Sequence, residues 1–282
     1  MKKIILVTVT VFGLIACANN NSITQKGKEM KTKKEKVVEL LNSIETGKNE
    51  PVAYINPKKY IQHNLAVADG LDGFAKLMAQ LPKNSAKVEV VRAFEDGDFV
   101  FTHTKYNFFD PKAGFDIFRF EDGKIVEHWD NLQEIVDETA SGKTQFDGTT
   151  KIVDIDKTQA NKLLIKKFID DVLMGKNPQK ITDYISAKTY FQHNPHVKDG
   201  LDGLNEALSK LANAGMPMVY EKNHMILGEG NFVLAVSEGL FMKKHVSFYD
   251  LFRIENNKIV EHWDTIEEIP PKTEWKNSNG KF

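Results

Sequence analysis

The side chains with the clearest capacity for chemistry lie in a heptapeptide, KIVEHWD, that occurs twice, 134 positions apart. Each copy carries a histidine two positions before an aspartate. Side chains two positions apart on a strand point to the same face. We therefore expect His128 to face the same space as Asp130, and His262 the same space as Asp264. An aspartate beside a histidine can fix its tautomer and raise its basicity, which suits acid/base chemistry.

The heptapeptide also has a second face, which raises a competing interpretation. By the same alternation Val126 joins the face of His128, whereas Ile125, Glu127 and Trp129 point the other way. In one interpretation the histidine face lines a ligand pocket. In the other, the tryptophan face is buried, the identity between copies is structural, and the histidine and aspartate form a surface pair.

A second repeated motif, QHN, adds an imidazole and an amide in each copy. It lies at the end of a short predicted strand, before a loop that carries glycines. In the first copy His63 and Asn64 can bind the carbonyl group of a ligand. Their counterparts in the second copy are His193 and Asn194. The alternative is that these side chains cap a nearby helix.

One candidate histidine is present in the first copy alone. Phe99, Phe101 and His103 alternate along one apolar strand face, and Val236 stands at the position of His103 in the second copy. If His103 is a working group, the first copy holds the competent pocket and the second is degenerate. If it is a core histidine with satisfied hydrogen bonds, the change to valine alters packing only.

The remaining candidates are aromatic or acidic residues close to these motifs. The tyrosine before each QHN motif can contact a ligand, although packing in the core is the simpler interpretation. An aspartate opens the strand before each heptapeptide, and a tryptophan lies inside it. These candidates for ligand binding are Tyr60, Asp116 and Trp129 in the first copy and Tyr190, Asp250 and Trp263 in the second.

The sequence offers little for a metal, a cofactor or a nucleic acid. The spacings HxxxH, HxH and CxxC are absent, and His193 with His196 falls in a loop broken by proline. No glycine-rich phosphate loop follows a predicted strand. The formal net charge of −1 lacks the basic balance that nucleic-acid binding requires. We therefore expect no metal, no cofactor and no nucleic-acid partner.

The motifs QHN, DGLDG and KIVEHWD recur in the same order, which indicates a duplicated domain. The period is far longer than the 20–50 residues of solenoid repeats. A stretch with little apolar content separates the two copies. We expect a first domain over 33–140, a linker over 141–154, a second domain over 155–270 and a C-terminal tail over 271–282.

Each copy has the pattern of helices followed by antiparallel strands. Val37, Leu40, Leu41 and Ile44 recur at helical spacing, and Gly47 ends that helix. A short second helix, the DGLDG loop and a third helix come next. Asp-Gly and Asn-Asn turns then join the strands into hairpins. This order predicts an α+β fold whose helices cover one face of a curved, mostly antiparallel sheet.

The order of elements, together with xQHN, DGxxG and GKIVEHWD, resembles the SnoaL-like proteins of the nuclear transport factor two-like superfamily. Within it the chain is most similar to predicted aldol-condensation or polyketide-cyclase proteins. The resemblance covers both copies. It implies two cone-shaped α+β barrel domains, each enclosing an apolar pocket. Because superfamily members commonly pair sheet against sheet, it also implies an internal pseudo-dimer and a monomeric chain.

The resemblance implies cofactor-free acid/base catalysis on a hydrophobic compound that carries a carbonyl group. This fold hosts many reactions and many binders, so it does not fix the function. The alternative is a non-catalytic protein of the cell envelope that binds an apolar ligand or a protein partner. The residues expected to act in catalysis are His63, His103, His128 and Asp130, with His193, His262 and Asp264 in the second copy.

The start of the sequence predicts export and lipidation. Two lysines precede a 12-residue apolar run, the length of a signal-peptide core. Leu14-Ile15-Ala16-Cys17 resembles a lipobox, so we expect a signal peptide over 1–16, lipidation of Cys17 and a flexible tether over 17–32. The protein would then be anchored to a bacterial membrane in the cell envelope. The alternative is a free or buried thiol behind an ordinary signal peptide.

Overall fold

The structure, a computed structural model, describes residues 31–81 and 85–282. The expected signal peptide, Cys17 and most of the expected tether lie outside the described residues. The described chain is mixed α+β with two five-stranded sheets, as expected. Within these two ranges, no helix has both the length and the apolar character needed to cross a membrane.

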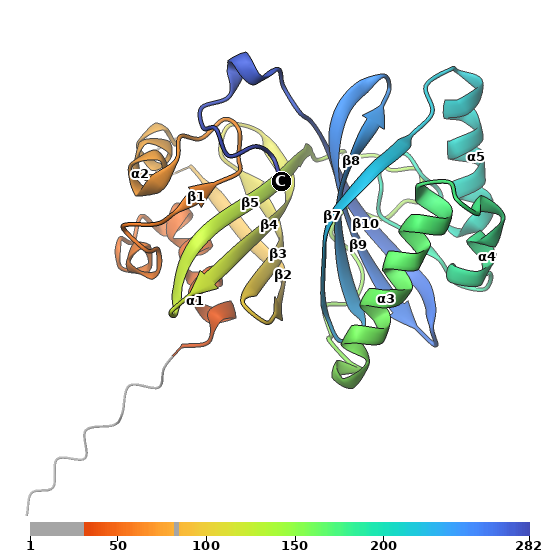
Figure 1. The fold of residues 1–282 in the computed structure, drawn as a ribbon, viewed down its shortest axis with the longest axis horizontal. Helices are drawn as coiled ribbons and strands as arrows, with labels where there is room; N and C mark the ends of the chain where they lie inside the picture. Colours follow the sequence, from red (N-terminus) through yellow and green to blue (C-terminus); the bar gives the residue numbers. More distant parts are fainter. Residues whose placement is uncertain (1–30, 82–84) are drawn as a thin grey trace, which may run out of the picture. The chain divides into compact units, whose positions relative to one another are not determined.

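The first half of the chain contributes two helices and the first sheet (Figure 1). Its strands lie in the order β1-β5-β4-β3-β2, with β1 parallel to β5 and the other pairs antiparallel. The elements are α1 (Lys33–Thr46), a 3₁₀ turn η1 (Glu50–Tyr54), β1 (Ile61–Gln62), α2 (Gly70–Gln80), β2 (Lys87–Asp96), β3 (Phe99–Asn107), β4 (Pro111–Glu121) and β5 (Lys124–Glu134).

The second half repeats this arrangement with the strand order β6-β10-β9-β8-β7. Its first long helix ends in a π-helical turn, η3. The elements are η2 (Ile155–Lys157), α3 (Thr158–Phe168), η3 (Ile169–Leu173), η4 (Pro178–Lys180), α4 (Ile181–Tyr184), β6 (Phe191–Gln192), α5 (Gly200–Asn213), β7 (Val219–Glu229), β8 (Phe232–Phe241), β9 (Lys244–Glu255), β10 (Lys258–Glu268) and η5 (Lys272–Glu274).

Local sequence explains where the elements begin and end. Thr32 and Glu35 form a capping box at the start of α1, and Gly47 ends the helix in the left-handed conformation. The turn between β9 and β10 places Asn256 and Asn257 at φ values of 51° and 58°. Asparagine tolerates these values, so the hairpins expected from the turn residues are confirmed.

The DGLDG motif has a structural reason for its identity in the two copies. It forms the first turn of α2 and α5, rather than a loop before each helix. Gly70 has a φ of 75°, and a Cβ atom on Gly73 would lie 1.7 Å from the Ala68 carbonyl oxygen. The Asp69 side chain accepts a hydrogen bond from the Gln62 amide at 2.9 Å. The motif therefore ties the helix start to the strand that carries QHN.

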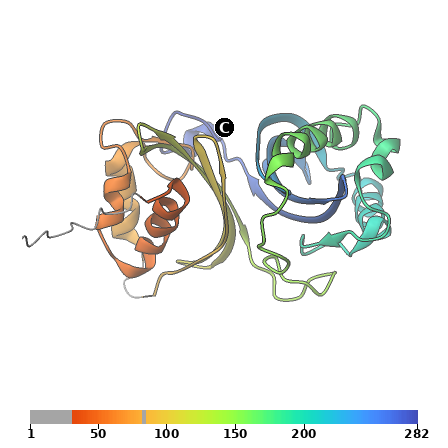
Figure 2. The same ribbon diagram turned by 90° about the horizontal axis from the view of Figure 1, so that it is seen from below.

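Each sheet has one face toward helices and one face toward the other sheet. In Figure 1, α1 and α2 lie on one face of the first sheet, and α3, α4 and α5 lie on one face of the second. The turned view in Figure 2 shows the same arrangement. Large apolar side chains from both sheets make a common core: Phe94, Phe101, Phe115, Ile117 and Trp129 pack with Phe232, Leu234, Tyr249, Leu251 and Trp263.

A β-bulge modifies the alternation expected for the heptapeptide. The register of β4 and β5 shifts after Arg119, which pairs with Glu127, while Phe120 pairs with Ile125. Val126 is the extra residue of the bulge. The side chains before it therefore point to the opposite face from the one that strict alternation predicts. Ile125 therefore packs in the core between helices and sheet, on the side of His128. Its expected position beside Trp129 is wrong for this reason.

Hydrogen bonds between the two sheets come in matched pairs. Asn131 of β5 donates to the Thr265 carbonyl at 2.8 Å, and these residues hold equivalent positions in the two copies. The Ile266 amide donates to Gln133 Oε1 at 2.7 Å. The equivalent bond, from the Leu132 amide to Glu267 Oε2, measures 3.2 Å. Equivalent residues that contact each other in this reciprocal way are typical of a two-fold interface.

The segment after each sheet contacts the opposite half. Residues 139–149, the first strap, reach the second half, where the Ala140 amide donates to the Pro195 carbonyl at 2.8 Å. Residues 276–282, the second strap, return to the first half, where the Lys276 amide donates to the Leu65 carbonyl at 2.8 Å. The end of the chain, marked C in Figures 1 and 2, belongs to the second strap. Residues expected to be a linker and a tail thus make specific contacts.

Candidate functional site

The first pocket is a cavity of about 410 Å³ between the helices and the sheet of the first half. Its walls are mostly apolar and come from α1, α2, β3, β4 and β5. Two acids and a histidine form a cluster in its wall: Asp116 of β4 with His128 and Asp130 of β5. An apolar cavity with a few converging polar groups is the usual form of a ligand site.

Gln62 fixes the orientation of the His128 ring. The Gln62 side-chain oxygen accepts a hydrogen bond from the Asn64 amide at 2.9 Å and lies 3.0 Å from His128 Nδ1. Because this oxygen is an acceptor, Nδ1 carries the proton. The second ring nitrogen, Nε2, then faces Asp116 Oδ1 at 3.4 Å. The imidazole is thereby held between an amide and a carboxyl group.

Asp130 has one oxygen that is held and one that is unpartnered. Asn64 donates to Asp130 Oδ2 at 2.6 Å, and the Ala66 amide fixes Asn64 through its side-chain oxygen at 2.9 Å. Asp130 Oδ1 is buried and has no hydrogen-bond partner among the described residues. Lys281 Nζ of the second strap lies 3.9 Å away. Buried polar atoms normally have a partner, so this oxygen is positioned to meet a ligand or water.

Asp116 is held by neighbours on its own sheet. Tyr106 donates to Asp116 Oδ2 at 2.6 Å and Thr102 donates to the same oxygen at 3.2 Å. Burial, followed by the charge of Asp116, raises the pKa of the Tyr106 hydroxyl well above its ordinary value. Tyr106 therefore stays protonated and acts as a donor.

The second pocket repeats the cluster in a smaller cavity of about 180 Å³. His262 lies 3.0 Å from both Gln192 Oε1 and Asp250 Oδ1. Asn194 donates to Asp264 Oδ2 at 2.7 Å, and Asp264 Oδ1 again has no hydrogen-bond partner within the described ranges. Each pocket thus presents an Asp-His-Asp cluster with one unpartnered carboxyl oxygen.

Burial and nearby charges shift the pKa values of two groups in the second pocket, His262 and Asp264. Burial disfavours the His262 imidazolium, but the hydrogen bond to Asp250 and the charges of Asp264 and Asp250 outweigh it and raise the pKa of His262. Burial raises the pKa of the Asp264 carboxyl, with a further contribution from Asp250. The surroundings of the second pocket therefore raise the pKa values of both groups.

His63 lies on the opposite side of the sheet from the first pocket. Its ring stacks on Trp129 with centroids 4.6 Å apart. Nε2 lies 2.9 Å from Glu127 Oε1, and Nδ1 lies 2.9 Å from the Gly280 carbonyl of the second strap. His63, expected to act in catalysis, and Trp129, expected to bind the ligand, therefore lie on the other face of the sheet from His128. Alternation along β5 places Trp129 there, and His63 follows Gln62 of β1 onto the same face.

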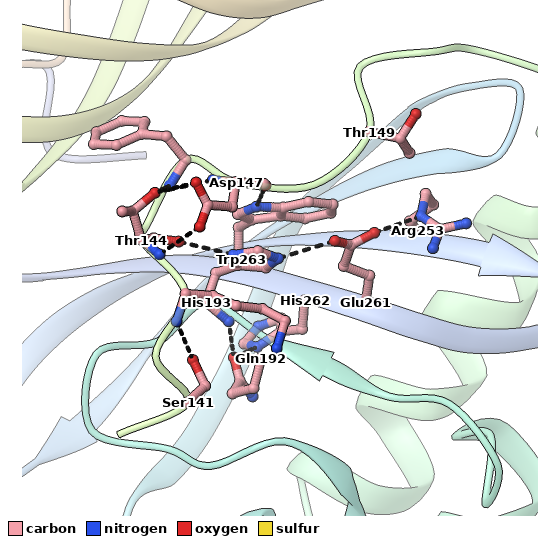
Figure 3. A network of polar contacts seen from close by, with 12 residues as sticks. Ser141, Thr144, Asp147, Thr149, Gln192, His193, Arg253, Glu261, His262 and Trp263 are labelled. Atoms are coloured by element: carbon pink, nitrogen blue, oxygen red, sulfur yellow. Dashed lines mark hydrogen bonds and ion pairs between the residues drawn. The ribbon is translucent and has the colours of Figure 1, made fainter. Parts of the chain in front are cut away.

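The second half has the same arrangement, which Figure 3 shows from close by. His193 stacks on Trp263 at 4.7 Å and lies 2.9 Å from Glu261 Oε1. Arg253 donates to the other oxygen of Glu261 at 2.6 Å. The Thr144 carbonyl of the first strap lies 2.8 Å from His193 Nδ1. His193 and Trp263, like their counterparts, are not among the residues that line the first and second pockets.

His103 also lies between the sheets, not in the first pocket. It is fully buried and stacks on Phe115 at 4.5 Å and on Phe146 of the first strap at 5.1 Å. Arg92 Nη1 lies 3.2 Å from His103 Nδ1, so that nitrogen is the acceptor. Burial, then the charges of Arg92 and His193, lowers the pKa of His103 well below its ordinary value. Its expected position among the pocket groups is corrected, and the change to Val236 concerns packing between the sheets.

The other expected residues line the pockets. Tyr60, Asn64 and Asp116 surround His128 and Asp130, and Tyr190, Asn194 and Asp250 surround the second cluster. The motif comparison missed the tyrosines that donate to the aspartates. Tyr106 lies on β3, whereas Tyr220, which donates to Asp250 at 3.2 Å, lies on β7. These strands are not equivalent, so comparing the two copies gives no signal for either residue.

The pocket clusters also contain the residue types that hold metal ions. In each pocket, one ligand atom from each of the three side chains lies within 4.8 Å of the others. In the second pocket both ring nitrogens of His262 are already within hydrogen-bond distance of protein oxygens. A metal there would have to displace one of these contacts.

The chain was compared with known proteins. Residues 50–128 match the family model of the SnoaL-like domain, so the expected SnoaL-like domain is confirmed for this part of the first half. A search of the curated proteins found no match.

Similar solved structures each align with about a third of the chain. TsrD from Streptomyces laurentii shares 18% identity, with a TM-score of 0.31, over 35% of this chain and 86% of its own. An NTF2-like protein of unknown function from Cytophaga hutchinsonii shares 17%, with a TM-score of 0.33, over 38% and 94%. An LEH-like epoxide hydrolase from M. tuberculosis shares 18%, with a TM-score of 0.31, over 36% and 81%.

The position of His103 predicts a pH dependence of stability. Because its pKa is lowered in the folded state, protonation at acid pH favours unfolding. The stability that neutral His103 contributes is present above about pH 6.5, the ordinary pKa of histidine, and is lost as the pH falls. Replacing it with the residue of the second copy, His103→Val, should make the loss of stability between pH 7.5 and pH 5 smaller than in the wild type. Urea unfolding at both pH values measures this difference.

The matched control is Val236→Ala at the equivalent buried position of the second copy, which removes no titratable group and should leave the pH dependence unchanged. If His103→Val shows the same pH dependence as the wild type, His103 is not a buried neutral group.

Proposed function

We propose that this chain is a SnoaL-like small-molecule-binding protein that catalyses cofactor-free proton transfer on a hydrophobic carbonyl compound in its first pocket. One observation carries the proposal: the unpartnered Asp130 Oδ1, next to His128, in a mostly apolar cavity. An ionised carboxyl group with an oxygen free of hydrogen bonds at the cavity wall can accept a proton from a bound ligand.

The chemistry is removal of a proton from the carbon next to the carbonyl. The C–H bond breaks, Asp130 Oδ1 takes the proton, and the electron pair moves to the carbonyl oxygen to give an enolate. A donor must stabilise that oxygen. Tyr60 lines the pocket, and burial, then the charges of Asp130 and Asp116, raise the pKa of its hydroxyl, so it remains a donor. Return of the proton to another carbon isomerises the compound, and attack on a second carbonyl forms a C–C bond.

The assignment predicts which substitution removes catalysis. The probe is 2-tetralone, an apolar ketone with acidic C–H groups, and the measurement is its hydrogen–deuterium exchange in D₂O followed by NMR. The wild type should accelerate exchange. Asp130→Asn should reduce the acceleration by about 10²-fold or more, the usual contribution of a general base. The matched control is Asp264→Asn, which makes the same change in the smaller pocket and should leave most of the exchange intact.

Two results would count against the enzyme. If 2-tetralone binds, as seen by shifts of the pocket resonances, but exchanges no faster than in buffer, the chain is a binder. This is the alternative of a non-catalytic envelope protein. If exchange is catalysed equally by wild type and Asp130→Asn, another group is the base.

We further propose that each half is a cone-shaped barrel and that the two form an internal pseudo-dimer, so the chain is a monomer. The reciprocal hydrogen bonds and the common apolar core support this, because a face that pairs with another chain in a dimer is here covered within one chain. Light scattering of the protein without residues 1–16 should give the mass of one chain. A stable species of twice that mass would contradict it.

We also propose that Cys17 is lipidated and anchors the protein in the cell envelope, with the hydrophobic ligand taken up there. The sequence Leu14-Ile15-Ala16-Cys17 supports this. In a bacterial host fed a radiolabelled fatty acid, the wild type should carry label and sediment with membranes. Cys17→Ser should do neither. Label retained by Cys17→Ser would place the modification elsewhere.

A further inference from the structure

The two straps place different residues at equivalent positions behind the pockets. The second strap presents the Gly280 carbonyl to His63, and the first strap presents the Thr144 carbonyl to His193. The next residue is Lys281 in one strap and Gln145 in the other. Both are buried, with 5% and 2% of their surface exposed. A buried cation in the second strap and a neutral amide in the first strap therefore hold equivalent positions.

The partners of these residues differ in the same way. Lys281 Nζ lies 2.5 Å from Glu267 Oε2 and 3.9 Å from Asp130 Oδ1. Gln145 Oε1 accepts from the Val136 amide at 2.9 Å. Gln133 holds the position equivalent to Glu267, because the heptapeptides are offset by 134. The first pocket thus has a Lys-Glu pair beside its aspartate, and glutamines hold the two equivalent sequence positions, Gln145 and Gln133.

Asp130 Oδ1 and Asp264 Oδ1, the oxygens without a hydrogen-bond partner among the described residues, therefore lie in different electrostatic fields. A positive charge within about 4–6 Å favours the ionised form of a carboxyl group. Asp130 has Lys281 at that distance. Across residues 31–81 and 85–282, no lysine or arginine forms an ion pair with Asp264. Burial raises the pKa of the Asp264 carboxyl.

The other groups that face the two carboxyls do not remove this difference. Lysine occurs in the first set alone, and the groups of the second set that can become cationic are imidazoles. Asp130 is faced by Tyr60, Asn64, Tyr106, Asp116, His128, Tyr249, Glu267 and Lys281, and Asp264 by Tyr190, Asn194, His196, Tyr220, Asp250 and His262.

We propose that Lys281 makes the two pockets chemically different. It keeps Asp130 a carboxylate, so the first pocket presents a base to its ligand. Gln145 provides no charge, so the second pocket presents the Asp264 carboxyl without a neighbouring lysine among the described residues, to a ligand small enough for its cavity of about 180 Å³. The role of Asp130 as a base rests on the proposed function, whereas the difference in charge between the pockets does not. Lys281 and Gln145 are positioning residues that act through the aspartates.

The test changes one charge at a time. One variant is Lys281→Gln, and the other is Gln145→Lys. NMR of protein labelled with ¹³C at the aspartate carboxyl carbons follows each group from pH 4 to pH 8, with Asp130→Asn and Asp264→Asn for assignment. The first variant should move the titration of Asp130 to higher pH by about one unit or more, the usual effect of one opposite charge. The second should move the titration of Asp264 to lower pH.

Lys281→Arg with Glu267 retained is the control, because it keeps the charge and should leave Asp130 ionised as in the wild type. Unchanged titrations in both variants would overturn the proposal. If Lys281→Gln does not fold, Gln145→Lys decides alone: a shift of Asp264 supports the proposal and no shift overturns it. The titrations need no ligand or turnover. If they move while 2-tetralone exchange is not catalysed, this inference holds and the proposed function fails.

Discussion

The alternation of side chains along β5 and β10 is the constraint on which the rest of the structure depends. Each strand supplies one face to the pocket and the other to the core between the sheets. His128 and Asp130 face the pocket, while Glu127 and Trp129 face the other sheet. A shift of one residue would exchange the two sets and bury the wrong groups in both places. The heptapeptide is identical in the two copies because nearly every position is committed to one face or the other.

The two halves also complete each other. The strap that follows β5 meets the second half, and the strap that follows β10 meets the first half. In each half an arginine contacts a glutamate, the glutamate contacts a histidine, and the histidine contacts a backbone carbonyl of a strap. Figure 3 shows this series for the second half. This exchange holds the QHN loops, and those loops supply Asn64 and Asn194 to the pocket aspartates. Pairing of the sheets and the shape of the pockets are therefore linked through the same residues.

Local patterns predicted the elements well, because caps, glycine turns and alternation act over a few residues. The α+β class, the hairpins and the cluster of His128 with Asp130 followed from them. The positions of His63 and His103 did not, because the sequence does not say which face of a strand meets helices and which meets a second sheet. Val126 forms a bulge that no local signal marks. Lys281 was beyond prediction, since it reaches Asp130 through a fold-back of the chain from residue 281 to the first half.

The central claim is that ligands bind on the side of His128 and Asp130, not on the side of His63 and His103. The most direct measurement is a ¹H–¹³C spectrum of protein labelled at the histidine rings, recorded while 2-tetralone is added. The account predicts that the His128 resonance shifts with saturation, while those of His63 and His103 stay in place. Saturable shifts of His63 or His103 with an unmoved His128 would contradict it.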